Sequence, residues 1–511
     1  MACGDFHIRK KVADAFRRQV ADPLAEVSLL GGDEVVANGG EVGKDRSARN
    51  GVNSRKYPFA AADELVQQIR GDVRMSHARS LGNDVGPPPT EVDTVVVGAG
   101  PQALTVLARW LYERPLDLRR VAVVESAGEW MTAWRAGFAR QRIDVLRSPG
   151  VHHPAPDDMA FVNAHGNWPT FEAACAAALC SGSVGPLQRP TTAAFWRFCR
   201  QLIEQTELNA RLVPATVVGA VAVRGRCGTS SWKVELDDGS TIGARQVVWA
   251  GNTRTRRVPA GVQLGGAVQH SGDVDLGAVG VGERIAVIGG GQSAGQLALR
   301  AAQRGAAVTL VSRGPHRVAD LDVDAGWLME DHLAPFRVTM DPAERRRVVE
   351  QVQCGSMTSD LELALRRSQI ARVVGAGEVT AQTDPDRGPV VGFAGVECEV
   401  DRVWAATGSV PDLRVAPALA GLAASGAPHI DGWPVLDDTL QWRDGFYVVG
   451  ALAALTLGPA AGNLGGARAA ADILANRGPE ACRTGVSTCR LSRQSQTIRN
   501  DSHSLLASSH A

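Results

Sequence analysis

The most constraining feature of this chain is a pattern that occurs twice. A short apolar run leads directly into a glycine-rich loop and then into an amphipathic run, first over residues 94–111 and again over residues 284–304. Strands and helices joined by such loops are typical of dinucleotide-binding units. The glycines allow a tight turn, and the helix N-terminus presents N–H groups to a pyrophosphate. We therefore expect an α/β fold with two Rossmann-like dinucleotide-binding domains.

The first loop reads Gly98-Ala99-Gly100-Pro101-Gln102-Ala103 and lies between an expected strand at 94–97 and an expected helix at 104–111. The next apolar run, residues 121–124, ends in Glu125. A carboxylate at that point accepts hydrogen bonds from both ribose hydroxyls, which indicates an unphosphorylated adenosine ribose, as in FAD or NAD. The alternative is a tight turn without a ligand. The agreement of strand, loop, helix and acid favours the cofactor.

The second loop reads Gly289-Gly290-Gly291-Gln292-Ser293-Ala294-Gly295, after an expected strand at 284–288. Here the following strand ends in Ser312-Arg313 instead of an acid. A hydroxyl and a guanidinium suit a 2′-phosphate, so this loop is predicted to bind NADPH rather than NADH. The alternative is that Arg313 is a surface arginine that stacks on adenine or faces solvent. An FAD loop followed by an NADPH loop describes an enzyme that passes hydride from nicotinamide to flavin.

The alternation of strand-like and helix-like runs divides the chain into domains. We expect an FAD-binding domain built from residues 91–279 and 396–478, with an NADPH-binding domain, residues 280–395, inserted into it. An alternating run at 231–236 followed by Asp237-Asp238-Gly239 predicts a hairpin within the first domain. Residues 1–90 are predicted to be a poorly ordered extension with one short helix near 13–27, and residues 479–511 a disordered tail.

These motifs resemble those of flavoproteins with two dinucleotide-binding domains, and among them the class B flavin-dependent monooxygenases. The run Gly98–Leu104 is similar to the Gly-x-Gly-Pro-x-x-Leu loop of lysine and ornithine N-hydroxylases of siderophore synthesis. The run Leu264–Ser271 resembles the Phe-x-Gly-x-x-x-His signature, with Leu264 in place of Phe, and residues 401–408 resemble the Ala-Thr-Gly motif that contains Thr407 and Gly408. Residues 249–252 are similar to that motif, but less closely. The resemblance to this group of proteins extends over about residues 92–474.

The resemblance implies an activity that the residues alone do not. Hydride from NADPH would reduce the flavin, and oxygen would then form a C4a-hydroperoxide that passes one oxygen atom to a small nucleophilic substrate such as an amine. Two alternatives stay open: an NADPH-dependent flavin reductase or oxidase without oxygen transfer, and a non-enzymatic regulatory protein that binds the cofactors. Many relatives have Gly-Asp where this chain has Gly450-Ala451, so the aspartate contact to the ribityl or pyrophosphate region of FAD is not expected here. Backbone donors before the last helix, around 458–465, are expected to face the flavin and stabilise negative charge on its reduced ring.

Several further side chains are candidates for the site. Trp134, like Trp130, either stacks on the flavin ring or packs under a loop. Arg147 lies in a stretch that passes the flavin in the N-hydroxylases. His152 and His270 are candidate catalytic groups, although His270 is also placed to fix the segment between the domains. No Cys or His cluster accompanies the His152-His153 pair, so no metal site is predicted.

The composition limits which binding partners and which cellular compartment are expected. Lys plus Arg and Asp plus Glu both number 54, which argues against nucleic acid as a partner. The nine cysteines include no Cys-x-x-Cys pair, which disfavours disulfide reductase chemistry. Without a signal peptide or an apolar run long enough to cross a membrane, we expect a cytoplasmic protein whose partners are oxygen and a small-molecule substrate. The sequence leaves the substrate and the oligomeric state open.

Overall fold

The computed structural model describes most of the region that carries the motifs. The described residues are 89–113, 116–158, 160–163, 183–184, 187, 189–224 and 230–476. The predicted N-terminal extension, with its helix near 13–27, lies outside them apart from its last two residues, and so does the predicted tail at 479–511.

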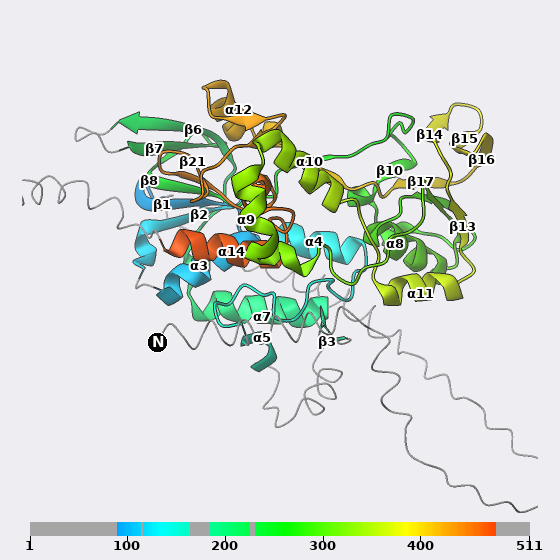
Figure 1. The fold of residues 1–511 in the computed structure, drawn as a ribbon, viewed down its shortest axis with the longest axis horizontal. Coiled ribbons are helices and arrows are strands. Elements are labelled where there is room, and N and C mark those ends of the chain that lie inside the picture. Colours follow the sequence, from blue (N-terminus) through cyan, green and yellow to red (C-terminus); the bar gives the residue numbers. More distant parts are fainter. Residues whose placement is uncertain are drawn as a thin grey trace, which may run out of the picture. The chain divides into compact units, whose positions relative to one another are not determined.

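A mainly parallel sheet carries the first glycine loop (Figure 1). Its strands follow the order β21-β22-β8-β1-β2-β5, and all neighbours except β21 and β22 run parallel. Val95 and Val96 of the central strand are fully buried, which explains the continuous apolar run in the sequence. The strands are β1 (Glu91–Val97), β2 (Val121–Val124), β5 (Leu212–Val213), β8 (Thr241–Trp249), β21 (Gln441–Arg443) and β22 (Phe446–Val448).

Two further strands extend this sheet as an antiparallel excursion. Strand β7 (Ser230–Leu236) pairs antiparallel with both β6 (Val217–Arg224) and β8, with Trp232 opposite Ala244. The turn between β7 and β8 contains Gly239 at φ +83°, a left-handed conformation that favours glycine. The predicted hairpin is therefore confirmed.

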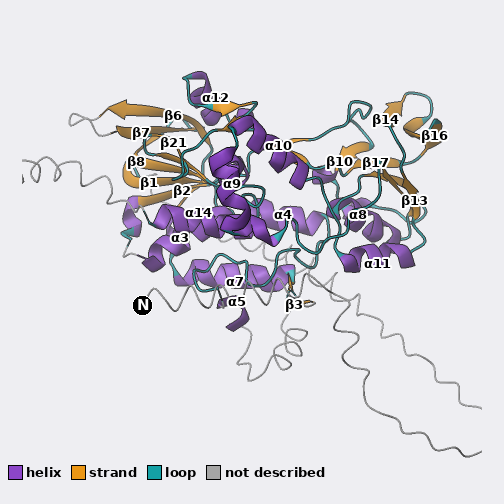
Figure 2. Cartoon of the chain, viewed as in Figure 1, coloured by secondary structure: helices purple, strands orange, loops and turns teal. Residues whose placement is uncertain are grey.

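Helices α3 and α14 pack against each other beside this sheet (Figure 2). Both contribute apolar side chains to a core shared with the strands, among them the fully buried Leu104 and Leu107 of α3. The helices of this part are α3 (Pro101–Glu113), α4 (Thr132–Arg140), α5 (Ala160–Asn163), α7 (Thr192–Gln205), α12 (Pro417–Ala424), α13 (Ala454–Leu457) and α14 (Leu464–Ala475). Two-stranded pairs join β3 (Ser183–Val184) to β4 (Arg189–Pro190) and β19 (His429–Ile430) to β20 (Trp433–Pro434).

A second, five-stranded parallel sheet carries the second glycine loop, in the order β10-β17-β11-β12-β13. Helices α8 and α11 pack on it, and an antiparallel sheet of β14, β15 and β16 follows in sequence. The elements are β10 (Val268–His270), β11 (Arg284–Ile288), α8 (Gln292–Gln303), β12 (Ala307–Ser312), α11 (Ser359–Arg367), β13 (Ala371–Val374), β14 (Val379–Asp384), β15 (Gly388–Phe393), β16 (Val396–Glu399) and β17 (Arg402–Ala405).

The packing departs from the predicted domain boundaries in two places. Strands β10 and β17, which we had placed in the first domain, belong to the second sheet. Val403 and Trp404 of β17 are fully buried, and this strand lies between β10 and β11. Conversely, α9 (Glu330–Thr339) and α10 (Pro342–Val352) fall within the predicted NADPH domain, yet their Phe336 and Val349 belong to the core of the first sheet.

A two-stranded antiparallel link of β9 (Arg254–Arg256) and β18 (Ser409–Pro411) connects the two sheets along the chain. Among the described helices, none combines the length and the apolar character needed to cross a membrane.

Candidate functional site

The first loop has the backbone geometry of a cofactor-binding turn. Gly98 adopts φ +96°, and its N–H donates to the carbonyl of Val124 at 2.8 Å. A Cβ atom on Gly98 would lie 3.2 Å from the Cα of Gly251, whereas a Cβ on Gly100 would meet no atom within 4 Å. Pro101 begins α3, a position that proline favours, and Ala103 is fully buried beneath it. The open side of Gly100 leaves room for a pyrophosphate above the helix N-terminus.

Glu125 stands beside this loop, as its position after β2 predicts. One carboxylate oxygen accepts the backbone N–H of Ala99 at 3.0 Å, and the other accepts the hydroxyl of Ser126 at 3.2 Å. Each oxygen has a second lone pair, so the carboxylate can also accept hydrogen bonds from a ribose.

Gln102 connects the first loop to two distant segments. Its amide nitrogen donates to the carbonyls of Ala461 at 3.4 Å and Asn463 at 3.2 Å, just before α14. Gly450, at φ +76°, lies so close that a Cβ on it would be 3.4 Å from the Cγ of Gln102. The Oε1 atom of Gln102 is buried without a hydrogen-bond partner among the described residues. An unpaired acceptor here fits a hydroxyl donor such as that of the FAD ribityl chain.

The second loop is built in a similar way. Gly289, at φ +150°, leaves no room for a side chain, because a Cβ would lie 2.4 Å from the carbonyl oxygen of Ala406. Gly291 caps α8, and the side-chain oxygen of Gln292 accepts the N–H of Thr358 at 2.9 Å. In the first turn of α8, Ser293 is exposed and Ala294 is buried.

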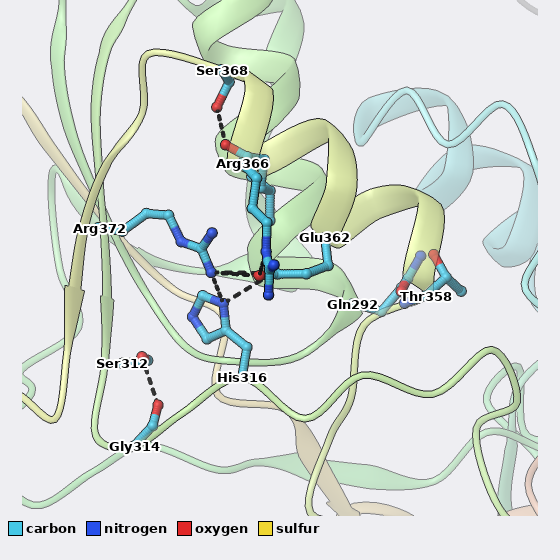
Figure 3. A network of polar contacts seen from close by, with 10 residues as sticks. Gln292, Ser312, Gly314, His316, Thr358, Glu362, Arg366, Ser368 and Arg372 are labelled. Carbon is cyan, nitrogen blue, oxygen red and sulfur yellow. Dashed lines mark hydrogen bonds and ion pairs between the residues drawn. The ribbon is translucent and has the colours of Figure 1, made fainter. Parts of the chain in front are cut away.

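The two residues after the second loop's neighbouring strand differ in what they offer a ligand. Ser312 is buried, and its hydroxyl donates to the carbonyl of Gly314 at 2.9 Å (Figure 3). Arg313 is exposed, and its guanidinium has no partner within the described part of the chain. The hydroxyl proton that we expected to face a 2′-phosphate is therefore directed into the chain, while the guanidinium is available.

A polar network that the sequence did not predict lies behind the second loop (Figure 3). The buried carboxylate of Glu362 accepts hydrogen bonds from Arg372 at 2.8 Å and Arg366 at 3.0 Å, and Arg372 also donates to Nδ1 of His316 at 2.8 Å. Burial alone would raise the pKa of Glu362, but the hydrogen bonds from Arg372 and Arg366 hold it below its ordinary value. The Cδ2 atom of His316 lies 3.7 Å from the position of a Cβ on Gly290. No local pattern joins these residues, which come from three separate segments.

His270, Thr407 and Gly408 meet at the link between the sheets. The N–H of Gly272 donates to Nδ1 of His270 at 3.2 Å, so Nδ1 is unprotonated and Nε2–H donates to the carbonyl of Gly408 at 3.0 Å. Burial lowers the pKa of His270. The Thr407 hydroxyl donates to the carbonyl of Arg257, and Gly408 adopts φ +82°. Because backbone groups occupy both ring nitrogens, the geometry supports His270 as a group that holds the link.

His152 and Trp134 both lie in packed surroundings. Burial, with a smaller effect of the Arg468 charge, lowers the pKa of His152 to about 4, so this imidazole is neutral near pH 7. The ring of Trp134 stacks on Phe138 with centroids 4.4 Å apart and lies 5.4 Å from the ring of Phe195. Roles of His152 in catalysis and of Trp134 in flavin binding stay predictions.

Arg147 joins the first part of the chain to the loop that follows the second glycine motif. Its guanidinium donates to the carbonyls of Ala319 and Leu321, both at 2.7 Å, and to the hydroxyl of Ser356 at 2.6 Å. It also pairs with Asp322 at 3.2 Å. These contacts occupy the guanidinium with protein acceptors, and its predicted contact with the cofactor stays a prediction.

Within the described ranges, no group of three or more His, Cys, Asp or Glu side chains is arranged to hold a metal ion. The three described cysteines, Cys199, Cys354 and Cys398, are free.

Residues 92–473 match the model of the pyridine nucleotide-disulphide oxidoreductase family. The chain belongs to this family. It is an oxidoreductase whose cofactors are FAD and a pyridine nucleotide, as the two loops predict. No curated protein matches the chain significantly.

Solved structures with a similar fold include three amino acid hydroxylases. An ornithine N-hydroxylase from Kutzneria sp. 744, solved with reduced FAD, NADP⁺ and L-ornithine, is 19% identical, with a TM-score of 0.59 over 76% of this chain and 98% of its own. L-lysine 6-monooxygenase from Pseudomonas syringae is 18% identical, with a TM-score of 0.57 over 76% and 99%. Ornithine hydroxylase from Pseudomonas aeruginosa, in its reduced form, is 15% identical, with a TM-score of 0.57 over 75% and 98%.

These relatives confirm the predicted fold of this oxidoreductase, with two parallel sheets of the Rossmann type, and the predicted resemblance to class B flavin monooxygenases. They share the fold across almost their whole length.

Proposed function

We propose that this protein is an NADPH-dependent FAD monooxygenase that acts on a small nucleophile, most simply an amine. The observation that carries the proposal is the difference between the two loops. A carboxylate, Glu125, stands beside the first, and an unpaired guanidinium, that of Arg313, follows the strand next to the second. This arrangement suits a bound flavin nucleotide and a phosphorylated nicotinamide nucleotide, respectively.

Different residues would bind different parts of the two cofactors. The first loop and Glu125 would hold the adenosine and pyrophosphate of FAD, and Gln102 and Gly450 would face its ribityl chain. The second loop, with Gln292 locked to the Thr358 backbone, would hold the NADPH pyrophosphate. FAD held at the first loop would supply the redox chemistry of a monooxygenase, with NADPH as the electron donor and oxygen as the source of the transferred atom.

Apolar side chains of residues 327–333 pack against the segment that leads into α14 and against the first turn of that helix. A Cβ on Gly458 would lie 2.8 Å from Leu333 and 3.3 Å from Trp327, and a Cβ on Gly465 would lie 2.8 Å from Leu328. This apolar cover would keep water away from that side of the flavin site, which a monooxygenase requires if oxygen is to reach the substrate rather than leave as peroxide.

The proposal of an amine substrate rests on the similar structures, which are named as an ornithine N-hydroxylase and an L-lysine 6-monooxygenase. We propose a substrate of the same chemical class. The free thiols of the described cysteines are consistent with a reducing compartment, and we propose the cytoplasm.

A coupling measurement tests this function. FAD-loaded protein is given NADPH and oxygen with L-ornithine or L-lysine as probe amines, and NADPH consumption, peroxide release and product mass are recorded together. A monooxygenase yields a product heavier by one oxygen atom and less peroxide than NADPH consumed.

Two other outcomes point to the alternative functions. Peroxide equal to the NADPH consumed, for every amine tested, identifies an oxidase. A purified protein that binds the nucleotides but reduces no flavin identifies a regulatory protein.

A further inference from the structure

Arg254 has an unusual set of partners for a partly buried charge. It lies on β9, and its Nε and Nη2 atoms donate to the hydroxyl and carbonyl of Ser409 on the facing strand, at 2.9 and 3.0 Å. Within the described residues, its Nη1 atom has no hydrogen-bond partner and the guanidinium forms no salt bridge. Asp322, whose charge acts on it, is itself paired with Arg147. The two bonds to Ser409 therefore fix a guanidinium whose charge is not neutralised.

The free end of Arg254 points to the segment that precedes α14. A Cβ on Gly462 would lie 3.4 Å from Nη1 of Arg254 and 3.2 Å from the Cβ of Ala451. The guanidinium and Ala451 therefore flank one position. An acidic side chain at position 451 would lie close enough to interact with Arg254. This chain has a methyl group there, so the positive charge stays unmatched.

This position belongs to the flavin end of the first cofactor site. Gln102 of the first loop donates to the carbonyls of Ala461 and Asn463, on either side of Gly462. Glu125 marks the adenosine end of the same site. Gly462 also lies two residues before α14, whose N-terminus carries a partial positive charge. Two sources of positive potential thus meet where a bound flavin ring would lie.

A partly buried guanidinium without an acid is costly unless a ligand supplies the negative charge. The flavin ring gains negative charge when it is reduced, and a nearby cation favours that form. We propose that Arg254 supplies the cation that stabilises the reduced, negatively charged flavin in this protein, and that Ala451 keeps this cation unpaired. The inference rests on FAD binding as stated in the proposed function.

The reduction potential of bound FAD tests the inference without NADPH or substrate. FAD-loaded protein is titrated with dithionite against a reference dye. Arg254→Gln should weaken binding of reduced FAD about tenfold relative to oxidised FAD, which shifts the potential by about 30 mV to more negative values. Arg254→Lys should retain most of the wild-type potential. Arg257→Gln, which removes the same charge from an exposed residue three positions along, should leave the potential unchanged.

A second pair of variants does not depend on the stability of Arg254→Gln. Ala451→Asp should pair with Arg254 and lower the potential, whereas Ala451→Asn should not. An unchanged potential in both Arg254→Gln and Ala451→Asp overturns the inference. So does equal weakening of oxidised and reduced FAD, which indicates a contact with the FAD phosphates instead. Wild-type protein that binds no FAD would contradict the proposed function itself.

Discussion

The carboxylate of Glu125 accepts the backbone N–H of Ala99 at 3.0 Å, which ties the end of β2 to the first glycine loop. The two residues lie 26 positions apart: Ala99 follows β1, Glu125 follows β2, and these two strands are parallel neighbours. The parallel pairing brings the carboxyl ends of both strands to one edge of the sheet, where a dinucleotide binds in folds of this kind.

Removing that carboxylate should weaken FAD binding. Hydrogen bonds to charged groups contribute about 1.5–3 kcal/mol, so Glu125→Ala should raise the Kd for FAD about 10- to 100-fold, measured by flavin fluorescence as apoprotein is titrated. Glu125→Gln keeps an acceptor for the N–H of Ala99, so its Kd for FAD should lie between those of wild type and Glu125→Ala. Equal affinity in Glu125→Ala and wild type would show that the carboxylate does not contact the cofactor.

Two glycines of the cofactor loops should respond differently to alanine. A Cβ on Gly100 would meet no atom of the described residues within 4 Å, so Gly100→Ala should leave the stability of the apoprotein unchanged and reduce FAD affinity by blocking close approach of the pyrophosphate. Gly289→Ala would place a Cβ 2.4 Å from the Ala406 oxygen at φ +150°, and should cost about 1–3 kcal/mol of unfolding free energy. Urea unfolding of the apoproteins measures both. If the FAD affinity of Gly100→Ala matches wild type, no phosphate approaches this loop.

Arg313 should determine the choice between the two nicotinamide nucleotides. Its exposed guanidinium is available to a 2′-phosphate, so Arg313→Ala should raise the Kd for NADP⁺ at least about tenfold and leave that for NAD⁺ unchanged, by calorimetry. The matched control is Arg367→Ala, which removes another exposed arginine, one that lies on α11. This variant should change neither the Kd for NADP⁺ nor the Kd for NAD⁺. A retained preference for NADP⁺ in Arg313→Ala would place the 2′-phosphate elsewhere.

His153 should make stability depend on pH. Burial, with a smaller effect of Arg468, lowers the pKa of His153 to about 4, against about 6.5 in the unfolded chain. Both states are neutral above pH 6.5. As the pH falls from about 6.5 towards 4, His153 binds a proton in the unfolded chain but not in the folded chain. The free energy of unfolding therefore falls by up to about 1.4 kcal/mol per pH unit.

Phenylalanine at this position should remove that dependence, because it has no proton to bind. It would pack against the rings of Phe161 and Phe198 that lie beside His153, and it would lose the contact of Nε2 with the carbonyl of Asp158. Urea unfolding at several pH values should show a smaller slope in His153→Phe than in wild type. The neighbouring His152, whose pKa is also about 4, should maintain the remaining slope. Identical slopes in the two proteins would mean that His153 binds its proton over the same pH range in the folded and unfolded chains.

The two loops, the strands and helices around them, and the difference between Glu125 and Arg313 can all be predicted from the residues alone. These features are local. A buried strand, a glycine turn and a helix within some twenty residues form one unit whose geometry depends little on distant contacts, so the spacing of residues predicts it. The family and the α/β fold followed from the same motifs.

Three features depend on the packing of distant segments instead: the sheet that β10 and β17 join, the direction of the Ser312 hydroxyl, and the contacts of Arg147 and Arg254. Arg147 meets acceptors more than 170 positions away, and Arg254 meets Ser409, which is 155 positions away. No local pattern encodes such contacts, because they depend on how separate elements pack. The reason that Ala451 matters is of the same kind: its methyl group has meaning only beside a guanidinium that the fold brings to it.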